Sequence, residues 1–174
     1  MKADAVAEET PLTPASASPV AVRELVAPTR IEIERLAVIF DHYRVHYGEA
    51  ADPSRTASWL ASHLAGGITA FVAHDDGEFI GFALVMDVPA SQRLGHFWQI
   101  RDLFVVPTQR RIGVGRSLLE FIRAAAISAG ASRLALQTET DNTSALRLYE
   151  GLGFTSVDGY RSLSLPLETR GQES

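Results

Sequence analysis

The stretch "VVPTQRRIGVGRSLLE", Val105–Glu120, decides how the rest of this chain is interpreted. A β-rich run ends in it at Pro107, and an apolar helix pattern follows it directly. The turn between them is rich in glycine and arginine, at Arg110, Arg111, Gly113, Gly115 and Arg116. Because an ordinary strand-to-helix connection needs only a turn residue and a cap, this composition predicts a loop that holds an anion.

The anion prediction rests on the physics of a helix N-terminus. The first N–H groups of a helix lack partners, and the aligned peptide dipoles place about half a positive charge there. Two common phosphate-binding motifs do not fit, since the chain has no Gly-x-x-x-x-Gly-Lys-Ser/Thr and the third glycine of a dinucleotide motif is absent. The alternative, that glycines only ease the turn and the arginines are solvated, stays open at this point.

Length and composition limit the classes of protein. With 174 residues, 46% of them hydrophobic, the chain is long enough for one domain, which we place at 20–174 after a disordered leader at 1–19. The chain has no cysteine, which excludes thiolate nucleophiles and zinc-thiolate sites and fits a cytoplasmic location. A net charge of −5 argues against nucleic-acid binding, and no run approaches the roughly 20 apolar residues of a membrane span.

Hydrophobic periodicity predicts an α/β (α+β) fold with a mixed, largely antiparallel central sheet flanked by helices. The expected strands are 19–27, two runs within 68–88 that form a hairpin around Asp75-Asp76-Gly77, 95–106, 132–139 and 161–167. The expected helices are 29–48, 53–66, one running to Gly130 and 142–153.

A second segment, "LALQTETDNTSALRLYEGLGF" at 134–154, allows the glycine-rich turn to be interpreted. Together the two segments resemble the GNAT superfamily of acyl-CoA-dependent N-acetyltransferases. The first matches the family's Arg-x-x-Gly-x-Gly signature from Arg110 to Gly115. The second matches its Asn-x-x-Ala-x-x-x-Tyr-Glu-x-x-Gly-Phe pattern from Asn142 to Phe154. The resemblance extends over about residues 20–167.

The resemblance implies acetyl-CoA as co-substrate, with no metal. Its pyrophosphate would be held by the backbone N–H groups of Arg111, Ile112, Gly113, Val114, Gly115 and Arg116. The positive charge of Arg110 would add to the attraction. Its pantetheine arm would lie along a bulged strand that splays from its neighbour, at Leu103, Phe104 and Val105. Asn142 would bond the pantetheine, although its position also suits a helix N-cap.

The catalytic residues follow less directly from the resemblance. Tyr149 would return a proton to the departing thiolate, or it is only a packed ring. For the general base, the polyamine branch of the family uses a glutamate where this chain has Arg101. Asp102, Glu139 and His96 are therefore the candidates, beside unassisted transfer to water. Strand alternation places Asp102 on the sheet face opposite Arg101.

The acceptor amine is expected to contact the region after the first helix. Tyr43, Tyr47, Glu49 and Asp52 can hold a cation by ring faces and carboxylates, or they form only a helix end and a loop. His42 and His46 lie four residues apart on that helix, but no third ligand is evident, so we expect no metal.

The resemblance therefore predicts an enzyme that moves an acetyl group from acetyl-CoA to a primary amine by direct attack in a ternary complex. A small-molecule amine is favoured as acceptor, with neither nucleic acid nor membrane as partner, and homodimer formation is left open. The alternatives are a non-catalytic acyl-CoA-binding or regulatory domain and a protein lysine or N-terminal acetyltransferase.

Overall fold

The structure is a computed structural model that describes residues 20–159 and 161–167. The chain divides after Leu136 into two compact units. The leader predicted at 1–19 lies outside the described residues.

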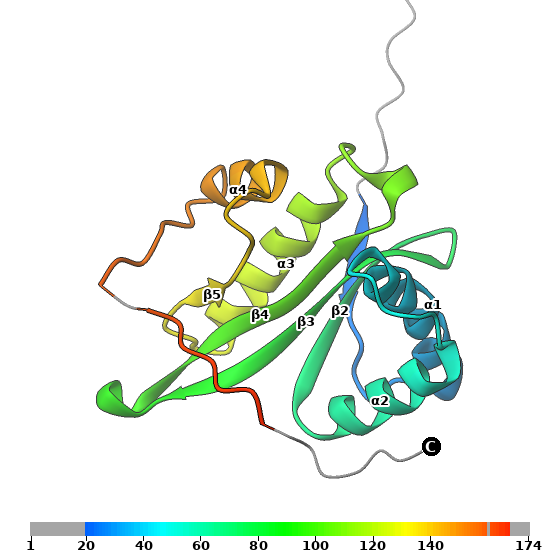
Figure 1. The fold of residues 1–174 in the computed structure, drawn as a ribbon, viewed down its shortest axis with the longest axis horizontal. Coiled ribbons are helices and arrows are strands. Elements are labelled where there is room, and N and C mark those ends of the chain that lie inside the picture. Colours follow the sequence, from blue (N-terminus) through cyan, green and yellow to red (C-terminus); the bar gives the residue numbers. More distant parts are fainter. Residues whose placement is uncertain (1–19, 160, 168–174) are drawn as a thin grey trace, which may run out of the picture. The chain divides into compact units, whose positions relative to one another are not determined.

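The first unit contains a five-stranded sheet in the order β1-β2-β3-β4-β5 (Figure 1). The strands are β1 Ala21–Glu24, β2 Ile68–Asp75, β3 Glu78–Ala90, β4 Gly95–Val105 and β5 Leu134–Leu136. The first four strands pair in antiparallel fashion, and β5 pairs parallel to β4. The predicted mixed, largely antiparallel sheet is therefore confirmed.

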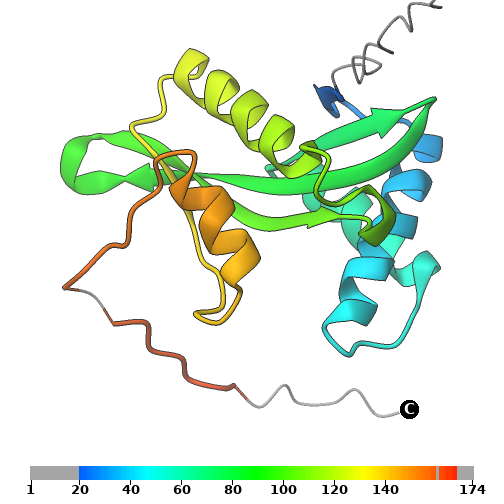
Figure 2. The same cartoon turned by 90° about the horizontal axis from the view of Figure 1, so that it is seen from above.

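Helices cover both faces of this sheet, as Figure 2 shows. On one face lie α1, Arg30–His46, and α2, Pro53–Ala65; on the other lies α3, Val114–Ser128. Short 3₁₀ turns, η1 Ser91–Arg93 and η2 Pro107–Gln109, stand at the two ends of β4. The first unit is thus a three-layer arrangement with the sheet in the middle.

Local signals in the sequence begin and end these elements. A capping box starts α1, since the Thr29 side chain accepts from the Glu32 N–H while the Glu32 carboxylate accepts from Thr29. The β2–β3 hairpin turns at Asp76 and Gly77, both with positive φ, of 45° and 83°. Positive φ at both turn residues is typical of a type I′ turn, and the hairpin predicted around these residues is confirmed.

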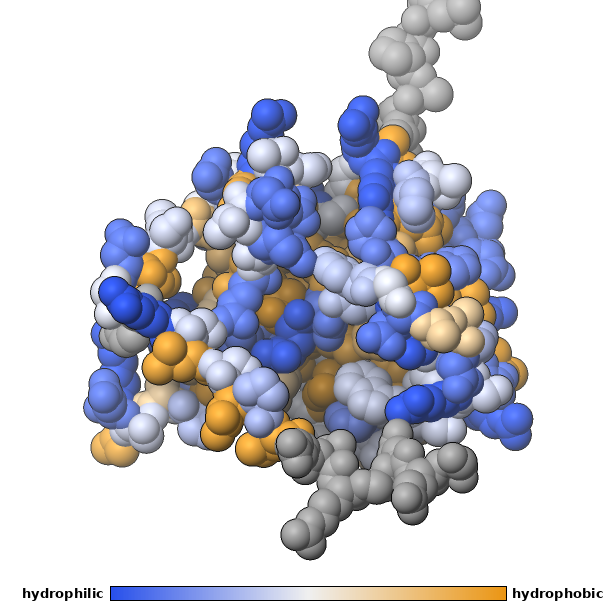
Figure 3. All heavy atoms as spheres, in the orientation of Figure 1, coloured by the Kyte–Doolittle hydropathy of each residue, from blue (hydrophilic) through white to orange (hydrophobic). Residues whose placement is uncertain are grey.

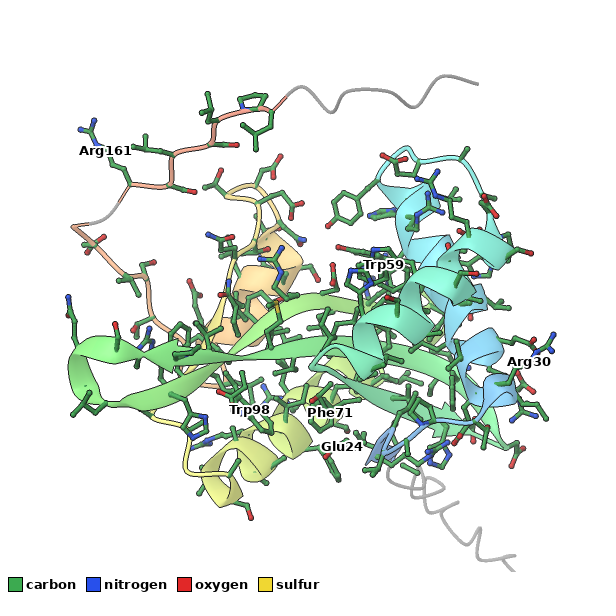
Figure 4. The ribbon with its side chains drawn as sticks, turned by 90° about the horizontal axis from the view of Figure 1, so that it is seen from below. Glu24, Arg30, Trp59, Phe71, Trp98 and Arg161 are labelled. Carbon is green, nitrogen blue, oxygen red and sulfur yellow. The ribbon has the colours of Figure 1, made fainter. Side chains whose placement is uncertain are left out.

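Apolar side chains on each face of the sheet pack against the helices that cover it. The layer against α1 and α2 contains the fully buried Leu36, Leu60 and Phe82. In the layer under α3, the ring of Phe71 lies 6.0 Å from Trp98 and 6.0 Å from Phe121. Figure 4 shows Phe71 and Trp98 on one side of the sheet and Trp59 of α2 on the other.

A bulge in β4 changes which face its side chains point to. Leu84 pairs with Asp102 and Val85 pairs with Ile100, so Arg101 is an extra residue in β4. Before the bulge, Trp98 packs under α3; after it, the Phe104 ring lies 5.8 Å from Tyr43 of α1. The expected bulge is confirmed, and the simple alternation used to orient Asp102 does not apply across it.

The second unit, 137–167 as described, contains α4, Thr143–Glu150. The Asn142 side chain accepts a hydrogen bond of 3.1 Å from the Ala145 N–H, so the predicted helix and its N-cap are confirmed. The prediction of a strand at 161–167 is wrong, because these residues form no strand. Leucines alternate there, but a strand forms only when a neighbour pairs with it, and alternation does not provide that neighbour.

Candidate functional site

The first component of the site is the N-terminus of α3. Gly113 occupies the N-cap with φ of +96°, and no side chain caps the helix. The first helical hydrogen bond runs from Ser117 N–H to Gly113 O at 2.9 Å. The N–H groups of Val114, Gly115 and Arg116 therefore have no partner within the helix and are available to an anion.

The backbone around Gly113 leaves room for a ligand. A Cβ built on Gly113 meets nothing within 4 Å, so the glycine is required by its left-handed φ and not by crowding within the protein. Arg111 also has positive φ, +67°, which is uncommon for a residue with a side chain. Two left-handed residues therefore shape the turn, while Ile112 between them is exposed.

The arginines of the turn are not equivalent. The Arg110 Nε donates to Val105 O at 2.9 Å, and its guanidinium lies 5.4 Å from the centre of the Phe104 ring. Arg116 approaches Glu120 at 3.5 Å, and all three arginines are exposed. Arg110 thus holds the turn against the end of β4, whereas no ion pair within the described residues engages Arg111.

Gly81, which the sequence analysis did not single out, brings α3 close to the strands. A Cβ at this position would lie 3.1 Å from Phe104 O and 3.2 Å from Val114 Cγ1. Glycine is therefore needed for the first turn of α3 to pack this tightly over β3 and β4. A lone glycine within a strand pattern is a signal of such close approach.

The second component is the unpaired edge of β4. On that side β5 pairs only with Trp98–Ile100 of β4. Among the described residues, Arg101–Val105 of β4 pairs with β3 alone, and no residue of β5 faces this segment. Pairing between β4 and β5 therefore ends at Ile100, as expected if the two strands separate beyond it. The edge formed by Leu103, Phe104 and Val105 is of the kind to which an extended ligand can add.

The third component is Asp102, which the bulge turns toward α1. The Tyr43 hydroxyl donates to Asp102 Oδ1 at 2.8 Å. Burial raises the pKa of Asp102, while the Tyr43 hydrogen bond and the positive charge of Arg101 oppose that rise. Two residues predicted for separate roles, base and acceptor binding, are therefore in direct contact.

Of the other candidate bases, His96 lies on β4 of the first unit, and Glu139 belongs to the second unit. His96 Nδ1 is 2.7 Å from Asp87 Oδ1. At about 3.3 Å per residue, His96 is roughly 20 Å along β4 from Asp102, so it is far from the unpaired edge. Glu139 belongs to the second unit, where its carbonyl accepts from Asn142 N–H at 3.2 Å, and its role as a base stays a prediction.

The residues predicted to bind the acceptor line the end of α1 and the loop to α2. Tyr47 caps α1, is 54% exposed, and its ring lies 5.0 Å from that of Tyr43. The Asp52 carboxylate accepts from Arg55 N–H at 3.0 Å and so caps α2, while Glu49 is 3.9 Å from Arg44. In Figure 3 the surface over α1 and α2, at the right, mixes hydrophilic with scattered apolar side chains.

Asp41, which the sequence analysis missed, organises this loop. Its side chain is nearly buried, at 4% exposure, and accepts from Arg44 at 2.8 Å, Thr56 Oγ1 at 2.9 Å and Asp52 N–H at 3.0 Å. Burial alone raises the pKa of Asp41, but these hydrogen bonds together lower it below its usual range. A charged residue four positions after Ala37, on the apolar face of α1, was the available signal.

A hollow opens between α1 and α2 beside this network. Its volume is about 260 Å³, and it is lined by Phe40, Arg44, Glu49, Arg55, Thr56 and Trp59. The ring of Phe40, one of the lining residues, is 5.5 Å from that of Tyr43.

In the second unit, Tyr149 lies on α4, seven positions after Asn142. Its ring is 5.8 Å from Phe154, and its carbonyl accepts from Phe154 N–H at 3.0 Å. The Asn-to-Phe motif is therefore a local structure in which the helix, its cap and its C-terminal turn come from adjacent residues.

Among residues 20–159 and 161–167, no cluster of three or more histidine, aspartate or glutamate side chains could hold a metal ion. In the same part of the chain, every helix is too short or too polar to cross a membrane.

The unpaired edge of β4 leads into the N-terminus of α3, which Gly113 shapes and no side chain caps. This arrangement suits an acyltransferase. Residues 33–154 match the family model described as "Acetyltransferase (GNAT) family". The chain belongs to this family. The GNAT chain is 34% identical over 126 residues to an uncharacterized N-acetyltransferase, YhfO, of Bacillus subtilis, with 72% of this chain and 85% of that protein covered.

Two further similarities agree with the assignment. An aminoglycoside N(6′)-acetyltransferase type 1 of Klebsiella aerogenes is 29% identical over 117 residues, covering 66% of this chain and 77% of that protein. The crystal structure of a probable acetyltransferase superposes with a TM-score of 0.77 at 26% identity, covering 86% of this chain and 99% of that one. This GNAT protein is therefore an acyltransferase enzyme with the GNAT fold.

Proposed function

We propose that this GNAT enzyme transfers an acetyl group from acetyl-CoA to a primary amine of a small molecule by direct attack in a ternary complex. The observation that carries the proposal is the unpaired edge of β4 from Arg101 to Val105, which runs into the uncapped N-terminus of α3. An extended arm and a phosphate at its end need these two features side by side.

Acetyl-CoA, when bound, supplies an acetyl group activated as a thioester. The N–H groups of Val114, Gly115 and Arg116 hold the pyrophosphate, and Arg111 adds positive charge. A backbone N–H on the free edge of β4 donates to the thioester carbonyl oxygen and stabilises the negative charge that develops on it. Asn142 binds the pantetheine arm in this proposal, in addition to capping α4.

The residue that accepts the proton comes from the side of β4 that faces the amine. The nitrogen of the neutral amine forms a bond to the thioester carbonyl carbon, and the bond from that carbon to the sulfur of CoA breaks. Asp102 takes a proton from the amine nitrogen, and Tyr149 gives one to the departing sulfur. Asp102 is preferred over His96 because it lies at the free edge of β4 and His96 lies roughly 20 Å along the strand.

A small-molecule acceptor is supported by similarity. One relative's name identifies it as acting on aminoglycosides, which are small-molecule amines. Tyr43, Tyr47 and Asp52 belong to the part of the first unit that would face such an acceptor. The proposal places the reaction in the cytoplasm, which the lack of cysteine fits.

The test is a panel of primary amines, with CoA thiol release measured as the product. The full chain is incubated with acetyl-CoA and aminoglycosides, amino acids, polyamines or a lysine-containing peptide. Acetylation of one small-molecule class well above the rate of acetyl-CoA hydrolysis supports the proposal, and turnover with the peptide alone replaces it with protein acetylation.

The Tyr149→Phe variant tests the proton donor in the same assay. Loss of the hydroxyl should lower kcat by about 10²–10⁴-fold, because that is the usual contribution of a general acid. Acetyl-CoA affinity and melting temperature should change little, since the ring and its contact with Phe154 remain. Wild-type turnover in a folded variant removes Tyr149 from the mechanism.

A further inference from the structure

We infer that Tyr43 is a positioning residue: its hydroxyl fixes the orientation of the Asp102 carboxylate and favours the ionised form that accepts the proton of the amine. This inference rests on the proposed role of Asp102. It changes the expected role of Tyr43, from a ring that holds the acceptor to a donor that acts through another side chain.

The bulge at Arg101 makes the contact possible. Before it, Trp98 lies under α3, and the pairing of Val85 with Ile100 places both side chains on that same side. The extra residue moves Asp102 and Phe104 to the side of α1. A regular strand would have kept Asp102 on the side of Trp98, out of reach of Tyr43.

The Tyr43 ring is held firmly enough to aim its hydroxyl. Its centroid lies 5.0–5.8 Å from four other rings, those of Phe40, Tyr47, Phe82 and Phe104. Packing on this scale restricts the ring before any substrate arrives, so the hydroxyl is preorganised. The bond engages Oδ1 of Asp102, and no other hydrogen bond from the described residues reaches the carboxylate, which leaves Oδ2 for the substrate proton.

Few charges surround Asp102. From α1 it meets the Tyr43 hydroxyl, and on β4 itself Arg101 supplies a positive charge. On β3, the residue paired with Asp102 is the buried Leu84. The Arg110 guanidinium, from the turn after β4, lies over the ring of Phe104. Asp41, further back on α1, is paired with Arg44. Tyr43 is therefore the hydrogen-bond donor on which the ionised carboxylate depends within the first unit.

The sign of the expected pH effect follows from these contacts. Burial raises the pKa of Asp102, and the hydrogen bond from Tyr43 opposes the rise. Without the hydroxyl, the pKa of Asp102 moves further up. Because a base works only when deprotonated, the acid limb of the kcat/KM profile moves to higher pH.

The experiment is the pH–rate profile of Tyr43→Phe beside the wild type, with the amine found by the panel. We expect the acid limb to move up by roughly one to two pH units, the range typical for a lost hydrogen bond to a charged group. Tyr47→Phe removes a hydroxyl from the ring packed against Tyr43, and its acid limb should stay at the wild-type position. A changed acceptor KM with an unmoved limb in Tyr43→Phe would show direct acceptor binding and overturn the inference.

A double-mutant cycle separates positioning from general stability. In an Asp102→Asn background, Tyr43→Phe should cost no further activity, because the group through which it acts is already gone. Independent, multiplying losses overturn the inference.

Carboxyl carbon NMR of Asp102 gives a readout that needs no turnover. The apparent pKa of Asp102 should be higher in Tyr43→Phe than in the wild type. An unchanged value overturns the inference even if the enzyme is active. Conversely, a raised value in a protein that acetylates no amine leaves the Tyr43–Asp102 coupling in place and rejects only the proposed function.

Discussion

The cofactor side and the acceptor side of β4 are built in different ways. On the cofactor side, the turn from Val105 to Arg116 is one continuous stretch, and its shape depends on Gly113 and on the start of α3. On the acceptor side, Tyr43 and Asp102 are 59 positions apart and meet because a bulge redirects the strand. In the proposed mechanism, a short motif thus binds the anion, while tertiary packing brings together the pair that takes the proton.

We therefore expect that damage to the turn weakens or abolishes acetyl-CoA binding. Damage to the Tyr43–Asp102 pair should slow the chemistry without affecting binding.

Replacing Gly113 by aspartate should abolish acetyl-CoA binding. The residue has φ of +96°, which a side chain disfavours, and the new carboxylate adds negative charge where the pyrophosphate binds. Isothermal calorimetry on the folded variant should detect no binding.

The matched control is Gly130→Asp, which also has a left-handed backbone, with φ of +77°, just past the other end of α3. It should lose stability but keep acetyl-CoA affinity. Equal affinity in the two variants contradicts a pyrophosphate site at the α3 N-terminus.

Replacing Asp102 by asparagine should lower kcat by about 10²–10⁴-fold, the usual contribution of a general base. Acetyl-CoA affinity, measured by calorimetry, should stay unchanged, because the turn from Val105 to Arg116 is intact. Normal turnover would remove Asp102 as the base and leave Glu139 or unassisted transfer to water, which Glu139→Gln would then distinguish.

Replacing Arg111 by alanine should weaken acetyl-CoA binding by about tenfold or more, as expected for the loss of one charge-assisted hydrogen bond. The loss should shrink as salt is added, since the site is exposed. Arg110→Ala should also lower the melting temperature, because its guanidinium braces Val105 O. Identical thermal stability in the two variants contradicts the bracing role.

Replacing Glu32 by glutamine should affect stability and leave catalysis intact. Hydrogen bonds from Thr29 and the Arg23 side chain lower the pKa of Glu32 to about 2. A depressed pKa contributes stability above the unfolded value, near 4.5, and that stability is lost as pH falls toward 2. The variant should therefore be about 1 kcal/mol less stable at pH 7, and the difference should vanish near pH 2.

Urea unfolding at several pH values measures this effect. Glu34→Gln is the control, because Glu34 forms an exposed i,i+4 pair with Arg30, and such pairs contribute little. A pH-independent difference between Glu32→Gln and the wild type contradicts the role of the ionised cap.

Much of the fold could be predicted from the sequence because its signals are local. The hairpin at Asp76 and Gly77, the capped start of α4 and the order of elements through α4 all follow the predictions. The strands predicted at 19–27 and 132–139 are shorter, Ala21–Glu24 and Leu134–Leu136, and residues 161–167 form no strand. These errors all concern strands, whose extent depends on a pairing partner from another part of the sequence.

By itself, the sequence determined the GNAT family, the glycine-rich turn around Gly113 and the cap at Asn142, since turns and helix caps depend on residues a few positions apart. Only the tertiary structure decided that Asp102 faces α1, that Tyr43 donates to it and that Asp41 fixes the loop before α2. These contacts join residues from different elements, and packing and the one-residue bulge set them.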